Sequence, residues 1–252
     1  MQAKLADLKS RLLSGRSLDE QMDIIAELAA ELGFEALAYD YTAVPLDHVG
    51  TVLTPPVVSL RNTPDNWEEL WCSEGYYQLD PVQHLAITSI APFVWSYRPE
   101  DETVLQPLLD RRHAPVSSYL QDAQLAHGAT IPIHLPRGGF ATLTGLRSNQ
   151  ERDVAGAHHA LAEFSLIAHA LQEAAYPLVL KESAKKSIRL TPRELECLRW
   201  AADGLTAAQI AEHLHRSLAT ISLHLTSAMH KLGAKNRVQA VARAVHYRLL
   251  DD

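Results

Sequence analysis

Closely spaced helix-start signals in the last quarter of the chain limit what it can fold into. Thr191 is followed by Pro192 at the first helical position and by Glu194 three residues on, which is a capping box with proline in its preferred place. Thr206 and Gln209 repeat the box further along the chain. The sequence therefore predicts two short helices in direct succession, each with its own N-terminal cap.

The distance to the next helix indicates a helix-turn-helix. Ser217 starts a third helix only three residues after Leu214, which lies on the apolar face of the second helix. Two short helices joined by so tight a turn are typical of this motif, whose second helix normally enters the DNA major groove. Asn236 and Gln239 open a fourth helix. We expect an all-α four-helix unit over residues 190–252.

Helical periodicity separates the faces of the third helix. Its core face repeats at i, i+4, i+7, i+8 and i+11, with Ile221, Leu225, Ala228, Met229 and Leu232. The candidate DNA-binding residues are Thr220, Ser222, Leu223, His224, Ser227 and Lys231 on this helix, with Arg216 and Arg237 beside it. Side chains of these kinds can contact base edges and phosphates. The alternative is a solvated helix face in a regulatory bundle.

The net charge of −7 is unevenly divided along the chain. Residues 1–183 hold 12 Lys and Arg against 24 Asp and Glu, a net charge of −12, whereas residues 184–252 hold 11 against 6, a net charge of +5. A uniformly acidic protein would be a poor partner for nucleic acid. The division instead indicates a basic module attached to an acidic one, which is consistent with DNA binding by the C-terminal part.

The polar segment KESAKKSIR at residues 181–189 interrupts the apolar patterning on either side of it. We interpret it as part of a linker over residues 179–189, between a ligand-binding and dimerisation domain at 1–178 and a DNA-binding domain at 190–252.

Upstream of that segment, helical and strand-like patterns alternate irregularly. Helical periodicity covers residues 5–13, 18–32, 67–77, 103–126 and 153–175, and strand-like runs cover residues 36–43, 92–95, 129–134 and 140–146, the last two joined by a turn at 136–139. This mixture predicts an α+β fold: an N-terminal α/β/α sandwich with an antiparallel sheet, followed by the all-α helix-turn-helix domain.

Several other kinds of protein are disfavoured by the sequence. No run of about 18 apolar residues could span a bilayer, and the N-terminus carries charges where a signal peptide has an apolar core, so we expect a cytoplasmic protein. Cys72 and Cys197 match no metal-ligand spacing and the histidines are scattered, so we expect no metal and no cofactor beyond a small-molecule signal. No G-x-S-x-G elbow occurs, which argues against an ester hydrolase.

The C-terminal segment LTPRELECLRWAADGLTAAQIAEHLHRSLATISLHLTSAMHKLGAKNRVQAVARA resembles the GerE-type domain of LuxR-family regulators. The residues that match the family's pattern are Glu194, Leu198 and Gly204 in the first helix, and Thr220, Ile221, His224, Lys231 and Leu232 in the recognition segment. Ser222 departs from the pattern, because many members carry Lys or Asn there.

Three N-terminal segments resemble the acyl-homoserine-lactone-binding domain of quorum-sensing LuxR-type proteins. They are residues 31–41, 63–96 and 128–144, and the absence of an alternating strand-helix rhythm argues against the alternative of a phosphate-receiver domain. From the residues alone, Trp67 and Trp71 share a helical face, and Asp80 is either a helix cap or a buried acceptor for a small ligand.

The resemblance implies particular roles in a ligand pocket. Trp67 takes the position whose indole N–H meets the lactone carbonyl, Asp80 the position that accepts the amide N–H, and Thr144 that of a hydroxyl near the acyl carbonyl. The candidate ligand-binding residues are Trp67, Trp71, Tyr76, Asp80, Trp95, Gly128, Thr130 and Thr144. The chain departs from the family at Trp71 and Thr63, where tyrosines are usual.

Together these features predict a ligand-responsive transcription regulator. The N-terminal domain would bind an acyl-homoserine lactone or a related signal, and a homodimer formed through the long helix at 153–175 would bind palindromic promoter DNA. Two alternatives stay open: an orphan regulator that responds to a non-lactone ligand, and one that acts without ligand because its own side chains fill the pocket.

Overall fold

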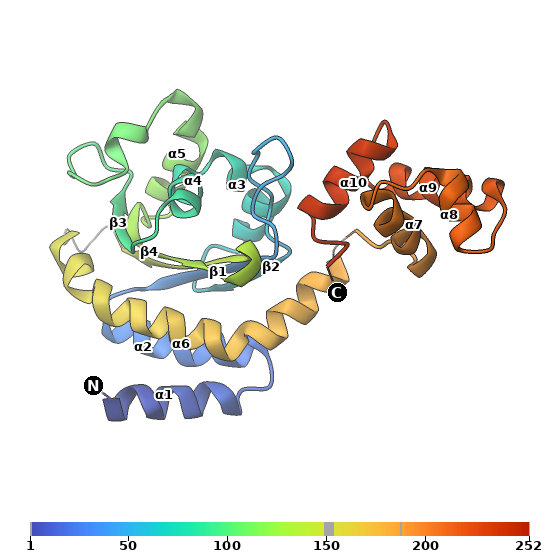
Figure 1. The fold of residues 1–252 in the computed structure, drawn as a ribbon. Helices are drawn as coiled ribbons and strands as arrows, with labels where there is room; N and C mark the ends of the chain where they lie inside the picture. The colour runs from blue at the N-terminus through green and yellow to red at the C-terminus, as the bar shows by residue number, and fades with distance from the viewer. Residues whose placement is uncertain (1, 149–153, 187, 252) are drawn as a thin grey trace. The chain divides into compact units, whose positions relative to one another are not determined.

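The computed structural model describes residues 2–148, 154–186 and 188–251 (Figure 1). The chain divides into two compact units: the first comprises residues 1–46 and 51–185, and the second comprises residues 186–252 with the short segment 47–50. Helix α6 (Val154–Lys186) takes in most of the segment expected to be a linker. The helix continues there because Val179 and Ser183 are buried and neither glycine nor proline interrupts the chain after Pro177.

The first unit contains a five-stranded antiparallel sheet in the order β2-β1-β5-β4-β3. Its strands are β1 (Ala36–Thr42), β2 (Val57–Arg61), β3 (Phe93–Ser96), β4 (His127–His134) and β5 (Phe140–Arg147). The four expected strands are confirmed, and the expected turn between the last two is a short 3-10 turn, Pro136–Gly138. Strand β2 was not expected, because its five residues follow Pro55 and Pro56 and show little alternation.

Helices cover both faces of this sheet (Figure 1). Helices α2 (Leu18–Glu31) and α6 lie along one face, with α1 (Gln2–Ser14) beyond them. Helices α3 (Tyr76–Leu79), α4 (Pro81–Thr88) and α5 (Ala114–Asp122) lie on the other face. Alternate strand residues enter the two cores, so that Tyr39 packs on the α2 and α6 side and Trp95 on the opposite side. The predicted α/β/α sandwich is confirmed.

The helices beside the candidate pocket are shorter than the sequence predicts. Residues 103–126 contain two 3-10 turns (Gln106–Leu108 and Arg111–His113) before α5, because Pro107 and Pro115 each favour a helix start over continuation. The expected 67–77 helix is a π-helical turn, Glu69–Ser73, separated from α3 by Gly75 at φ 82°. The expected start of the long helix at Asp153 lies outside the described residues.

The second unit consists of α7 (Pro192–Ala202), α8 (Ala207–His213), α9 (Leu218–Lys231) and α10 (Arg237–His246). The four predicted caps are confirmed: Thr191, Thr206, Ser217 and Asn236 each accept a hydrogen bond from a backbone N–H three residues on. The predicted core face of α9 is buried at Ile221, Leu225, Ala228 and Leu232. The four-helix helix-turn-helix unit is thereby confirmed.

Among the residues that the structure describes, no helix is both long and apolar enough to cross a membrane. The same residues contain no cluster of three histidine, cysteine, aspartate or glutamate side chains that could hold a metal ion. Neither Cys72 nor Cys197 takes part in a disulfide bond.

Candidate functional site

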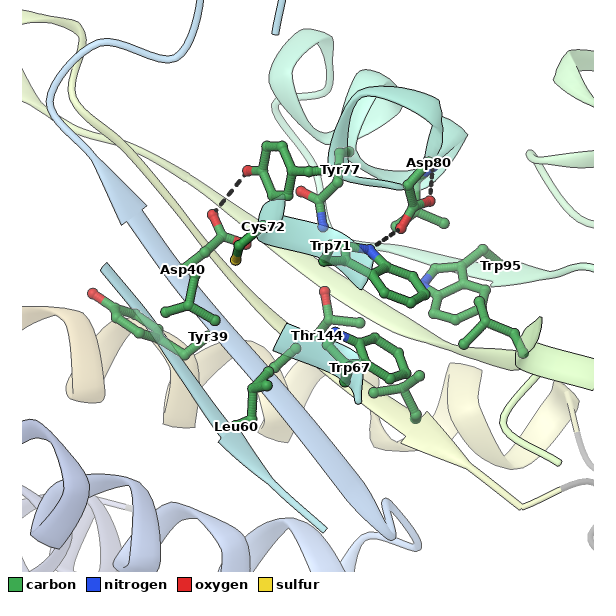
Figure 2. Close-up of a pocket in the computed structure, with 16 residues that line it drawn as sticks. Tyr39, Asp40, Leu60, Trp67, Trp71, Cys72, Tyr77, Asp80, Trp95 and Thr144 are labelled. Carbon is green, nitrogen blue, oxygen red and sulfur yellow. Dashed lines mark hydrogen bonds between the residues drawn. The ribbon is translucent and has the colours of Figure 1, made fainter. Parts of the chain in front are cut away.

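A cavity of about 30 Å³ lies in the first unit, on the side of the sheet that carries α3, α4 and α5. Five of the eight candidate ligand-binding residues line it: Trp67, Trp71, Asp80, Trp95 and Thr144 (Figure 2). These residues come from the π-helical turn and the segment before it, the start of α4, and strands β3 and β5. The fold therefore brings together side chains that are up to 77 positions apart, from Trp67 to Thr144.

Two stacked tryptophans form one wall of the cavity. The rings of Trp67 and Trp71 lie 4.1 Å apart between centroids with an interplanar angle of 10°, and both side chains are buried. Tyr119 of α5 meets Trp67 edge-on at 6.1 Å and Trp71 at 5.6 Å. The shared face expected from the i, i+4 spacing is thus observed, and the large rings account for the small volume that is left.

Asp80 is a helix cap and a cavity residue at the same time. Its Oδ1 accepts hydrogen bonds from the Val82 backbone N–H at 2.9 Å and from the Tyr97 hydroxyl at 2.6 Å. Its Oδ2 accepts one from the Trp71 indole N–H at 3.1 Å. Burial raises the pKa of this carboxyl above its ordinary value, and the three hydrogen bonds act in the opposite direction. A buried carboxylate that caps a helix and faces a cavity can also accept from a ligand.

The other three candidates, Thr130, Gly128 and Tyr76, are not in the cavity lining but contact residues that are or that neighbour them. Trp95 Nε1 donates to Thr130 Oγ1 at 2.9 Å, and the hydroxyls of Thr130 and Thr144 lie 3.0 Å apart on neighbouring strands. Gly128 is needed for packing, since a Cβ there would lie 2.2 Å from the Gly145 carbonyl oxygen. Tyr76 packs on Trp71 at 5.4 Å. Thr130, Gly128 and Tyr76 therefore lie outside the cavity lining.

Sequence reasoning missed four polar residues in this region: Asp40, Tyr77, Gln83 and Tyr97. Asp40 and Gln83 line the cavity, and both are buried. Burial raises the pKa of Asp40 to about 7, against hydrogen bonds from Thr142 and Tyr77 that lower it. An acidic residue inside the strand-like run at 36–43 was the available signal, because a charge in a buried strand rarely occurs without a specific reason.

The candidate DNA-binding face lies on α9. Ser222 and Leu223 are exposed, His224 is half-buried, and Arg216 before the helix is exposed. Thr220 is half-buried and its hydroxyl lies 2.8 Å from that of the capping residue Ser217. The N-terminal half of α9 therefore presents exposed side chains on this face, and it is the part of a recognition helix that reaches base edges.

Three other DNA-binding candidates have partners inside their own unit. Ser227 Oγ donates to Glu194 Oε1 at 2.7 Å and Lys231 Nζ to Glu194 Oε2 at 2.8 Å, which joins α9 to α7. Arg237 donates to the Leu205 carbonyl at 2.8 Å. Burial would raise the pKa of Glu194, but hydrogen bonds from Lys231, Ser227 and the Thr191 N–H lower it to about 2.

Comparisons with known proteins match both units. Residues 17–175 match the family described as an autoinducer binding domain, and residues 189–244 match the one described as bacterial regulatory proteins, luxR family. The transcriptional activator protein BjaR1 of Bradyrhizobium diazoefficiens is 30% identical over 240 residues, covering 94% of this chain and 91% of that protein. The HTH-type quorum sensing-dependent transcriptional regulator RpaR of Rhodopseudomonas palustris is 32% identical over 225 residues, covering 88% and 85%.

A crystal structure of Escherichia coli SdiA has the same fold, with a TM-score of 0.67 at 20% identity over 99% of each chain. The chain therefore belongs to the luxR family of transcription regulators, with an autoinducer-binding domain followed by a helix-turn-helix DNA-binding domain. Its relatives are transcription regulators and not enzymes.

Proposed function

We propose that the N-terminal unit binds an acyl-homoserine lactone, or a closely related acylated amide, in the cavity beside Asp80. The observation that carries this proposal is a buried carboxylate facing a cavity whose lining is mostly apolar and includes three tryptophans. A mostly apolar pocket with a few polar groups is typical of small-molecule sites. Asp80 would accept the ligand's amide N–H, Trp67 would donate to the lactone carbonyl, and Thr144 would contact the acyl carbonyl.

Ligand entry would require side chains to move. The cavity holds about 30 Å³, whereas pockets for small organic ligands are commonly about 300 Å³ or larger. Trp71 is the side chain that must give way first, because its indole N–H donates to the carboxylate oxygen available to the ligand amide. A ligand bound only by the folded protein would then stabilise that state by mass action.

The C-terminal unit would bind promoter DNA. We propose that Ser222, Leu223 and His224 contact base edges and that Arg216 contacts a phosphate. Ser227, Lys231 and Arg237 would chiefly hold the helices in place, because their polar groups bind within the unit. Two copies of the chain would pair through α6, within an N-terminal domain over about 1–178, to form a homodimer. The two DNA-binding domains at 190–252 would then be related by two-fold symmetry, so their DNA site would be palindromic.

A second candidate is a regulator that acts without ligand. Two observations favour it: the tryptophans nearly fill the cavity, and Trp71 already satisfies Asp80. Such a protein would be stable and would bind its palindrome without any additive.

One experiment separates the two. Protein purified without additive is titrated with acyl-homoserine lactones of short, medium and long chain, while tryptophan emission and the melting temperature are followed. The lactone proposal expects saturable quenching and a raised melting temperature in the wild type and in Asp122→Asn, an exposed carboxylate in the same unit. Both signals should be lost in Asp80→Asn. A stable protein that ignores every lactone and still binds DNA would instead establish the second candidate.

A further inference from the structure

Besides Asp80, the cavity is lined by a second group of polar side chains, which includes Asp40 and Gln83. Figure 2 shows Asp40 and Tyr77 toward one side of the cavity and Asp80 and Trp95 toward the other. Asp40 and Gln83 line the cavity and are only 4% and 6% exposed. The roles proposed above for the lactone ring and its amide use neither residue. Their presence needs an explanation, because an acyl chain would ordinarily be met by apolar side chains.

Asp40 is held in place by two neighbouring hydroxyls. It lies on β1 directly opposite Thr142 of β5, whose Oγ1 donates to Asp40 Oδ2 at 2.5 Å. Tyr77 of α3 donates its hydroxyl proton to Asp40 Oδ1 at 3.2 Å. A carboxylate has about four lone-pair positions, so these two donors leave it able to accept another. The side chain is therefore a fixed acceptor at the cavity wall.

Gln83 presents a buried acceptor that the protein itself does not satisfy. Its Oε1 has no hydrogen-bond partner among the residues that the structure describes, and it is shielded from solvent. Gln83 lies on α4, three residues after Asp80 caps that helix, so both residues face the cavity from the same side of one helix. A buried carbonyl oxygen without a donor destabilises a protein unless some other group supplies one.

We propose that Asp40 and Gln83 form a second polar subsite for a hydroxyl group on the acyl part of the ligand, which would donate its one hydrogen bond to Gln83 Oε1 or to the Asp40 carboxylate. The inference rests on the proposed function of this cavity and narrows its ligand class to hydroxylated acyl groups. A plain alkyl chain would leave Gln83 Oε1 buried without a donor, and sites built around hydrogen bonds discriminate strongly against such analogues.

A hydroxyl fits this subsite better than a charged amine. The pKa of Asp40 is raised to about 7 by burial, so both protonation states are populated near neutral pH. A hydroxyl can donate to the carboxylate and can accept from the protonated acid, whereas an ammonium group requires the ionised form. A neutral ligand group also avoids the desolvation of a second buried charge.

Matched pairs of lactones test the proposal. Each pair has the same acyl length and differs only in a hydroxyl at the far end, and three lengths cover the unknown reach of the pocket. Dissociation constants are measured by calorimetry at one pH for the wild type and for Gln83→Met, which removes the acceptor and keeps the side-chain length. We expect the hydroxylated member of the best pair to bind roughly tenfold more tightly to the wild type. The ratio should fall in Gln83→Met, because only the Asp40 carboxyl is then left to bind the hydroxyl.

The possible outcomes distinguish failure of the second subsite from failure of lactone binding itself. Equal affinity within every pair, or a preference that Gln83→Met does not reduce, would overturn the second subsite and leave lactone binding intact. Failure of every lactone to bind would overturn both. Asp40→Asn is an independent test, since it should also reduce the preference for the hydroxylated lactone. If Asp40→Asn does not fold, the result for Gln83→Met is the one that tests the proposal.

Discussion

Trp71 and Asp80 form a hydrogen bond inside the N-terminal unit, with the indole Nε1 3.1 Å from Oδ2 of the carboxylate. The residue that departs from the family's usual tyrosine thus donates to the residue expected to accept the ligand amide. The Trp71 indole N–H therefore occupies Asp80 with the same kind of hydrogen bond that the amide N–H of a ligand would make. Binding must compete with this internal bond, and the strength of that competition can be measured.

Substitution of Trp71 should lower the stability of the ligand-free protein and raise its affinity for the ligand. In Trp71→Phe the carboxylate loses one donor and the wall loses part of its stacked area, so we expect the unfolding free energy to fall by about 2 kcal/mol. The affinity for an acyl-homoserine lactone should rise in the same variant. Urea unfolding and calorimetric titration check the two effects. Lower stability together with lower affinity would show that Trp71 contacts the ligand directly.

Asp40 should make the stability of the N-terminal unit depend on pH. Burial raises the pKa of its carboxyl from 3.8 to about 7, so the folded state holds its proton more tightly than the unfolded state does. The contribution is therefore most favourable below about pH 4 and is lost as the pH rises to about 7. Urea unfolding between these values should show a falling free energy, and Asp40→Asn should flatten the slope. An unchanged slope would mean that Asp80, whose pKa is also raised, dominates.

Gly128 and Gly139 offer a matched pair for testing backbone packing. A Cβ at Gly128 would lie 2.2 Å from the Gly145 carbonyl oxygen, whereas a Cβ at Gly139 meets nothing closer than 3.5 Å. We expect Gly128→Ala to destabilise the protein by about 3 kcal/mol or to prevent folding, and Gly139→Ala to change stability by less than about 1 kcal/mol. Thermal unfolding measures both. A Gly128→Ala protein of normal stability with altered ligand affinity would instead place this residue in the pocket.

Substitution of Lys231 should change the stability of the DNA-binding unit, whereas substitution of Arg216 should change its affinity for DNA. Lys231→Met leaves the buried Glu194 without its cation, so we expect a loss of about 2 kcal/mol of stability and little change in the salt dependence of DNA binding. Arg216 is exposed, and Arg216→Ala should leave stability within about 0.5 kcal/mol while lowering the slope of log affinity against log salt by about one. A reduced slope for Lys231→Met would assign that side chain to a phosphate.

The part of the fold that follows local rules was predictable from the sequence. The caps at Thr191, Thr206, Ser217 and Asn236 were read directly, because each places a side-chain acceptor three residues before the N–H that it binds. Strand β2 was not, since its place in the sheet depends on pairing with β1 and not on its own five residues.

Five cavity-lining residues could be named from the sequence, but their hydrogen-bond partners and the other polar lining residues could not. Family resemblance brought Trp67, Trp71 and Asp80 together, and the structure places them at one cavity. Nothing in the local sequence could show that Trp71 donates to Asp80, or that Lys231 pairs with a glutamate 37 positions away. Such long-range contacts depend on how the elements pack. A cationic residue on a helix face fits a phosphate and a neighbouring carboxylate equally well by pattern alone.

The near-parallel stack of Trp67 and Trp71, with centroids 4.1 Å apart, has an optical consequence. Two indoles held this close couple their electronic transitions, and a paired positive and negative exciton signal appears in circular dichroism when the transition dipoles of the two rings are skewed within their planes. That signal depends on the mutual orientation of the rings and vanishes when they separate. A change in this signal on ligand addition would therefore report whether the bound ligand separates the two tryptophan rings or leaves their stacking intact.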